Sequence, residues 1–270
     1  MTATPQGAPG PDDVPAAEEA ELRRGALAPW LPLLAAVALN AAMLVWVAAA
    51  LPGLPDTVPT HWGPGGRPDA WEPTTFGSVA FGPLMNLGTV AVLGLVAAGM
   101  PLLSTAPRDW TPWQRVRQAG VTRGVREGLG WVPLLVSLLT LPATVSVLRG
   151  GDGSTPWWTM PLIVTLILPG IFGALAWSMR RGTRWADRAA ERLGYRPTPE
   201  ETAGEALWTP MGMKRDPSDP ATFPPKREGF GIGTTVNLAT PLGRVLTIGF
   251  MAAFGVLLPL GIWIAAWAAR

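Results

Sequence analysis

Five long apolar stretches, none containing an ionisable side chain, divide this 270-residue chain. They cover residues 31–51, 77–103, 128–148, 157–179 and 245–269. A helix rises about 1.5 Å per residue, so about 20 apolar residues cross a hydrocarbon core about 30 Å thick. In lipid, such a segment satisfies its backbone N–H and C=O groups only as a helix. The sequence therefore predicts an all-α membrane protein, a polytopic bundle of five transmembrane helices with one larger cytoplasmic loop.

The overall composition agrees with a membrane location and narrows the chemistry. Hydrophobic residues make up 48% of the chain and charged residues 15%, and there is no cysteine. A chain without cysteine has no disulfide, no thiol nucleophile and no cysteine-based metal site. With a single histidine, a metal would be left to carboxylates, and we predict neither a metal nor a cofactor. The net charge of +2 is too small for nucleic-acid binding, which needs a concentrated basic face.

The basic residues are unevenly distributed among the segments that connect the stretches. Of the 21 Lys and Arg residues, 18 lie in residues 1–30, 104–127 and 180–244. The other three, on the opposite side, are Arg67, Arg149 and Arg270. The positive-inside rule places the arginine-rich side in the cytoplasm. We therefore expect the N-terminus inside, the C-terminus outside, and arginines near the membrane that contact anionic lipid headgroups.

The first apolar stretch has a second interpretation, as a signal peptide. Ala48, Ala49 and Ala50 resemble the small residues of a cleavage site. The stretch is longer than the about 7 to 15 apolar residues of a typical signal peptide. We therefore expect it to remain as a membrane anchor.

The stretches and their connections divide the chain into four parts. Residues 1–28 mix Pro, Gly, Ala and acids without apolar periodicity, and they are predicted to form a disordered cytoplasmic tail. Residues 29–179 are predicted to form a four-helix membrane domain whose outer loop, 52–76, is a Pro- and Gly-rich system of turns. Residues 180–244 form the larger cytoplasmic loop, and 245–270 form the fifth transmembrane helix.

Two further helices are expected beside the membrane on the cytoplasmic side. Tryptophans and valines among the arginines of 104–127 predict a short helix lying on the headgroups. Trp185, Ala189 and Leu193 recur at four-residue spacing and predict an amphipathic helix that ends at Gly194. The rest of this loop, 207–241, is too short for a core of its own, so it folds against the membrane domain or stays mobile.

Asn40 and Asn86 are the most polar residues within the apolar stretches. Polar side chains in hydrocarbon seek hydrogen-bond partners on another helix. We interpret both as contacts between helices, with a substrate site as the alternative. Small-residue pairs at four-residue spacing, Gly170 with Ala174 and Gly249 with Ala253, also allow close helix packing.

The outer loop carries a recognisable string. It reads LPDTVPTHW over 54–62, then a Gly-containing turn, then PDAW over 68–71. This string resembles the signature of the SdpI-like family of bacterial membrane proteins, in which a first span is followed by LPD-x-(I/V)-P-T-H-W, a turn and P-D-x-W. The resemblance implies a bacterial inner-membrane protein with ligand-binding residues in this loop, namely Asp56, Pro59, Thr60, His61, Trp62, Asp69 and Trp71.

The resemblance extends to a short module in the larger cytoplasmic loop. Residues of the module that often accompanies this family recur between 208 and 241. The contacts it implies for a cytoplasmic partner are Trp208, Asp219, Lys226, Arg227 and Asn237.

His61 is the one histidine of the chain, and two carboxylates, Asp56 and Asp69, lie in the same loop. Either carboxylate would fix the tautomer of the imidazole and make the loop sensitive to pH near neutrality. The alternative is structural: Thr60, His61 and Trp62 cap the loop and anchor it at the membrane interface.

The family resemblance implies a binding or sensing role without catalysis. The ligand would be a secreted antimicrobial peptide or an envelope-stress signal outside, and a regulator would bind inside. The alternative is a small transporter or channel component, but the spans lack the ionisable residues that usually mark a substrate pathway. An enzyme using His61 with Asp56 or Asp69 is disfavoured by the scarcity of catalytic groups, so we expect no enzyme.

Overall fold

The structure is a computed structural model that describes residues 13–103, 110–150, 153–227 and 233–270. Residues 1–12 of the predicted tail and 104–109 of the basic loop lie outside the described residues. The helices are α1 (Asp13–Arg23), α2 (Leu31–Ala50), α3 (Phe76–Leu103), α4 (Pro112–Leu148), α5 (Thr159–Arg192), α6 (Pro199–Ala206), α7 (Pro241–Ala252) and α8 (Leu258–Ala268). The strands are β1 (Thr57–Trp62) and β2 (Pro68–Pro73).

Five helical segments of the described chain are long and apolar enough to cross a membrane, which confirms the predicted fold class. The fifth consists of α7 and α8, joined without a break by a π-helical turn at Ala253–Leu257. Large apolar side chains cover the outside of the helices: Val45, Leu95 and Val245 are 70%, 74% and 66% exposed. Water would disfavour such a surface and lipid would cover it. The chain is a multi-pass membrane protein.

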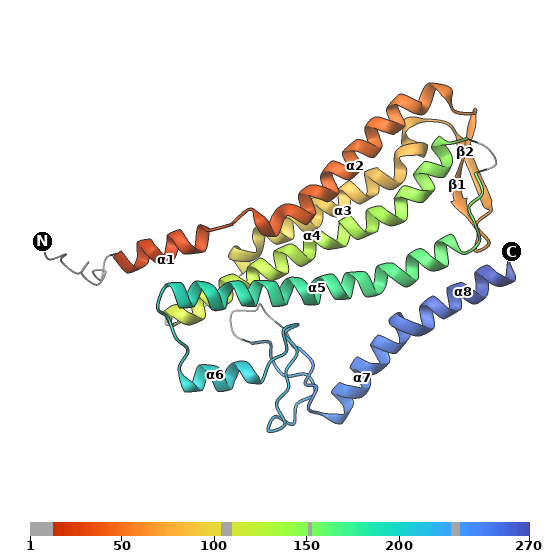
Figure 1. The fold of residues 1–270 in the computed structure, drawn as a ribbon. Coiled ribbons are helices and arrows are strands. Elements are labelled where there is room, and N and C mark those ends of the chain that lie inside the picture. Colours follow the sequence, from red (N-terminus) through yellow and green to blue (C-terminus); the bar gives the residue numbers. More distant parts are fainter. Residues whose placement is uncertain (1–12, 104–109, 151–152, 228–232) are drawn as a thin grey trace, which may run out of the picture.

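The bundle has two distinct ends (Figure 1). The β1–β2 hairpin, the α4–α5 turn and the C-terminus lie at one end, which we call the hairpin end. Helix α1, helix α6 and the irregular chain after it lie at the other. We call residues 195–240 the loop module and this the module end. Helices α2 to α5 pack along one another, and the fifth span contacts α5, where Trp263 Nε1 donates a 3.0 Å hydrogen bond to Thr165 Oγ1.

Three helices are joined by a buried polar cluster at mid-span. Asn40 of α2 and Asn86 of α3 are 0% and 2% exposed. Their Nδ2 atoms donate hydrogen bonds of 2.9 and 2.6 Å to Oγ of Ser137 on α4. Asn86 also donates to the Pro133 carbonyl oxygen at 3.0 Å. The interpretation of both asparagines as contacts between helices is therefore confirmed.

Helices α4 and α5 form an antiparallel pair and approach most closely at glycines. A Cβ added to Gly182 would collide with the Gly120 carbonyl oxygen and lie 2.8 Å from the Gly124 nitrogen. The two glycines chosen from the sequence show no such approach: a Cβ built on Gly249 meets no heavy atom within 4 Å, and one on Gly170 meets only Leu135 Cδ1, at 3.8 Å. The close backbone approach of α4 and α5 at these glycines thus lies outside the predicted apolar stretches.

The prediction of a disordered tail over 1–28 was wrong for its described part. Residues 13–23 form α1, and its acids bind arginines on α4 and α5. Arg115 donates to both carboxylate oxygens of Glu18, at 2.9 and 2.7 Å, and Arg192 pairs with Glu21. The composition of the tail resembled a disordered chain, but the partners that order it lie about 100 and 170 residues away in sequence.

The two helices expected beside the membrane are not separate helices. Helix α4 begins at Pro112, where Thr111 and Gln114 form a capping box, and it continues into the third span. Helix α5 likewise runs from the fourth span to Arg192, and Gly194 follows in the left-handed conformation (φ +73°) that favours glycine. Nothing between 112 and 128 stops a helix, so the helix continues rather than turning onto the headgroups.

Candidate functional site

The predicted outer loop is a two-stranded antiparallel hairpin rather than turns alone. Thr57 lies opposite Pro73, and Trp62 lies opposite Pro68, with irregular pairing on both sides of His61. The chain reverses over Gly63–Arg67, where the Gly63 N–H donates to the Arg67 carbonyl oxygen at 2.9 Å. Gly66 adopts a φ of +77°, which only glycine adopts without strain.

One side of the hairpin is fastened to the helix bundle. Val58 is 2% exposed and packs with Val47, Val79 and Val147 from three helices. Trp62 Nε1 donates a 2.8 Å hydrogen bond to the Gly153 carbonyl oxygen in the α4–α5 turn. The Thr155 N–H donates to the Gly66 carbonyl oxygen at 2.8 Å. The hairpin is therefore held against the bundle at both its base and its tip.

The opposite side of the hairpin presents polar and aromatic groups to the surroundings. His61 Nδ1 and Asp69 Oδ1 lie 2.5 Å apart across the two strands, with side chains 70% and 52% exposed. Asp69, rather than Asp56, is thus the carboxylate that orients the imidazole. The Trp71 side chain is 49% exposed.

The seven predicted ligand residues separate into two groups. Asp56, His61, Asp69 and Trp71 are exposed. Pro59 is buried, and Thr60 and Trp62 are partly buried. The structural alternative, in which residues 60–62 anchor the loop, therefore fits Trp62, because its indole holds the hairpin to the α4–α5 turn. His61 is instead exposed together with Asp69.

In the loop module, two of the five predicted partner residues serve the module itself. Asn237 is fully buried, and its Nδ2 donates to the Asp216 and Asp219 carbonyl oxygens at 2.8 and 2.9 Å. Its Oδ1 accepts from the Asp216 and Ala239 N–H groups. Asp219 accepts from Lys214 Nζ at 2.8 Å. Asn237 thus organises the module from within and offers no surface to a partner.

The other three predicted residues, Trp208, Lys226 and Arg227, line a cavity of about 600 Å³. Its lining comes from the module and from the parts of α4 and α5 near it. An adjoining hollow of about 320 Å³ shares these three residues and Arg117. The resemblance named these three residues as contacts for a partner and named no residue from the helix side of the cavity.

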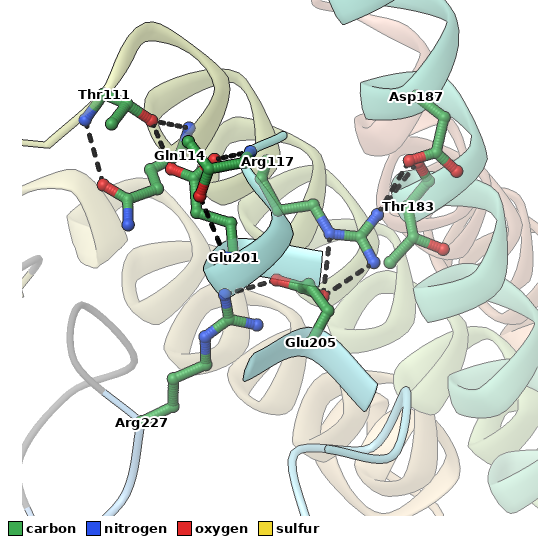
Figure 2. Close-up of polar contacts among 9 residues, drawn as sticks. Thr111, Gln114, Arg117, Thr183, Asp187, Glu201, Glu205 and Arg227 are labelled. Atoms are coloured by element: carbon green, nitrogen blue, oxygen red, sulfur yellow. Dashed lines mark hydrogen bonds and ion pairs between the residues drawn. The ribbon is translucent and has the colours of Figure 1, made fainter. Parts of the chain in front are cut away.

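Arg117 organises the polar side of the cavity (Figure 2). Its Nη2 lies 3.0 Å from Glu205 Oε2 on α6, and its Nη1 lies 3.1 Å from Asp187 Oδ1 on α5. Arg227 pairs with the other oxygen of Glu205. Burial raises the pKa of Glu205, but Arg227 and Arg117 outweigh it, so the pKa lies below the ordinary value. The Glu205 carboxylate therefore links α6 to Arg117 of α4 and to Arg227 of the loop module.

A second contact attaches α6 to the start of α4. Thr111 Oγ1 donates a 2.6 Å hydrogen bond to Glu201 Oε1, while the same threonine caps α4. Thr198 and Glu201 also form the capping box of α6. The S/T-x-x-E/Q spacing of both caps was visible in the sequence. Their mutual contact was not, because it joins residues 90 positions apart.

Among the described residues, no group of three or more His, Asp or Glu side chains converges on a place that could hold a metal ion. The charged side chains of the cavity are instead mainly basic. An anionic or amphipathic molecule fits this chemistry better than a cation does.

Comparison with protein families gives a match to part of the chain. A family model described as Domain of unknown function (DUF1648) matches residues 38–87. The match covers most of α2, the hairpin and the first part of α3, and so includes Asn40, Asn86 and all seven predicted ligand residues. No curated protein and no solved structure matches the chain. The chain is thus a multi-pass membrane protein in which the hairpin and the adjoining parts of the first two spans match a domain of unknown function.

Proposed function

We propose that the chain is a recognition protein of SdpI-like type in the bacterial inner membrane, acting by binding and not by catalysis. The hairpin faces the outside, where it binds a secreted antimicrobial peptide or an envelope-stress ligand. The loop module faces the cytoplasm, where it contacts a regulator. The excess of basic residues at the module end supports this orientation.

One observation carries the proposal: the hairpin is fixed on one side and open on the other. Trp62 and Val58 secure it to the bundle, while the His61–Asp69 pair remains exposed. A rigid scaffold that presents polar and aromatic side chains binds a partner without losing much conformational entropy. The matched family segment is centred on this hairpin.

The loop module supports the second half of the proposal. It is tied to α4 and α5 through Arg117 and Thr111, so a displacement of these helices would reach the module directly. Helices α4 and α5 also carry the turn on which the hairpin rests. The two candidate surfaces therefore share the same pair of helices.

The proposal is tested by survival of a peptide-sensitive bacterial host. The host expresses the parent chain, the double variant His61→Ala/Asp69→Ala, or the control Glu72→Ala. Glu72 is an exposed acid on the same strand as Asp69. Each strain is challenged with a panel of secreted antimicrobial peptides at equal membrane abundance of the protein. We expect protection by the parent and Glu72→Ala, and loss of protection in the double variant.

Two results would count against the proposal. Equal protection by the parent and the double variant would remove the hairpin surface from the function. Absence of protection against every peptide would remove the immunity role and leave the resemblance as one of fold alone.

A further inference from the structure

The cavity at the module end has an apolar floor that belongs to the membrane helices. Val121, Val125 and Leu129 recur every four residues along α4, and Leu175 and Met179 do so on α5. Residues four apart lie on one face of a helix, so two apolar stripes face the cavity. Leu129, Leu175 and Met179 lie inside the predicted spans, whereas Val121 and Val125 lie beyond them. The floor therefore extends from the hydrocarbon level towards the headgroup level.

The rim of the same cavity is basic. Arg117, Lys226 and Arg227 line it, against one acid, Glu205. Both arginines contact Glu205, whereas the exposed Lys226 ammonium makes no ion pair with any described residue. With Asp187, which pairs with Arg117 from α5, three positive charges face two negative charges, so one additional anion would balance them.

We propose that this cavity binds one anionic phospholipid from the leaflet at the module end. The phosphate lies at the rim beside Lys226 and the two arginines, and an acyl chain lies along the floor between α4 and α5. The volume, about 600 Å³, is in the range of sites that enclose small amphipathic ligands. The bilayer is the source of the ligand because the floor continues into the spans. This inference does not depend on the proposed role of the hairpin.

The lipid would also act on the fold of the module. Trp208, Lys226 and Arg227 come from the module, whereas the floor comes from α4 and α5. One bound molecule would therefore contact both parts and hold the module against the membrane. This is a specific site, and it differs from the general attraction of surface arginines to anionic headgroups.

The test is native mass spectrometry of the full chain in detergent, with equal amounts of phosphatidylglycerol and phosphatidylcholine. We expect the parent to retain one phosphatidylglycerol in preference to phosphatidylcholine. Lys226→Gln should reduce this retention roughly fivefold, the effect of one basic side chain near an anionic surface. Arg215→Gln, an exposed base of the module outside the cavity, should leave retention unchanged.

The apolar floor has its own variant and control. Val125→Phe should fill the floor and abolish retention, whereas Leu138→Phe, on the lipid-facing side of α4, should not. Equal retention of the two lipids, or retention unaffected by both Lys226→Gln and Val125→Phe, would overturn the proposal. So would displacement of the lipid by glycerol phosphate at equal concentration, because a soluble anion would then be the ligand.

Discussion

At the scale of single residues, glycines and buried amides decide how the helices meet. Gly120 and Gly182 allow the backbones of α4 and α5 to touch, and Asn40, Asn86 and Ser137 join three helices in the hydrocarbon. The asparagines could be predicted because a polar side chain in an apolar stretch requires a partner. The glycine crossing could not, because many glycines have suitable spacing and only the packing shows which of them meet.

Gly182→Ala should destabilise the protein. The added methyl group would collide with the backbone of α4, and separating the two helices should cost about 1 to 3 kcal/mol. The measurement is the free energy of unfolding in detergent. Gly173→Ala on the same helix is the matched control, because a Cβ there meets no atom within 4 Å. Helix propensity alone favours alanine at both positions, so equal changes in stability in the two variants would contradict the role of the crossing.

Asn86→Ala should lower the free energy of unfolding by about 1 kcal/mol, in the upper part of the range for hydrogen bonds between membrane helices. The reason is the loss of its bonds to Ser137 and the Pro133 carbonyl. Thr89→Ala serves as the control, since the Thr89 hydroxyl bonds only within α3, to the Met85 carbonyl. No difference between the two variants would contradict the interhelical role.

At the scale of elements, the spans were predictable and their continuations were not. Apolar length alone specifies a span, because lipid leaves a helix as the only choice for the backbone. The extension of α4 back to Pro112 depends on a cap at Thr111 and on contacts with α5 and α6. The β1–β2 hairpin was missed because prolines in both strands and an irregular register conceal its alternation.

The structure of the loop module could not be predicted for a second reason. Its described part is held by local polar contacts rather than by an apolar core, so no hydrophobic pattern marks it. Asp216 accepts hydrogen bonds from the Ser218 hydroxyl at 2.6 Å and its N–H at 2.9 Å, and it pairs with Lys214. These contacts lower the pKa of Asp216 to about 2. The unfolded module binds the proton more tightly, so this contribution to stability is present above about pH 4 and is lost as the pH falls towards 2.

Hydrogen exchange should show this pH dependence directly. Protection of the Ser218 and Asn237 amides should fall as the pH is lowered from 4 towards 2, after correction for the intrinsic exchange rate. In Asp216→Asn the dependence should flatten. Glu200→Gln, which removes an exposed acid of α6, should behave as the parent. A parent-like profile in Asp216→Asn would assign the acid sensitivity to another group.

At the scale of the whole molecule, the two candidate surfaces lie at opposite ends of one bundle (Figure 1). The hairpin end also holds the C-terminus, since Gly65 lies against Ala269, and the module end holds α1. The recognition proposal requires that these ends lie on opposite sides of the membrane. The distribution of arginines in the sequence predicts that the module end faces the cytoplasm and the hairpin end faces the outside.

The most direct measurement is labelling of single cysteines in intact cells, for which this cysteine-free chain is a natural background. Ala70→Cys on the hairpin and Ala203→Cys on α6 are matched replacements of exposed alanines. With a maleimide that does not cross membranes, Ala70→Cys should react in intact cells and Ala203→Cys only after lysis. The reverse pattern, or equal labelling of both in intact cells, would contradict an outer recognition hairpin with its module inside.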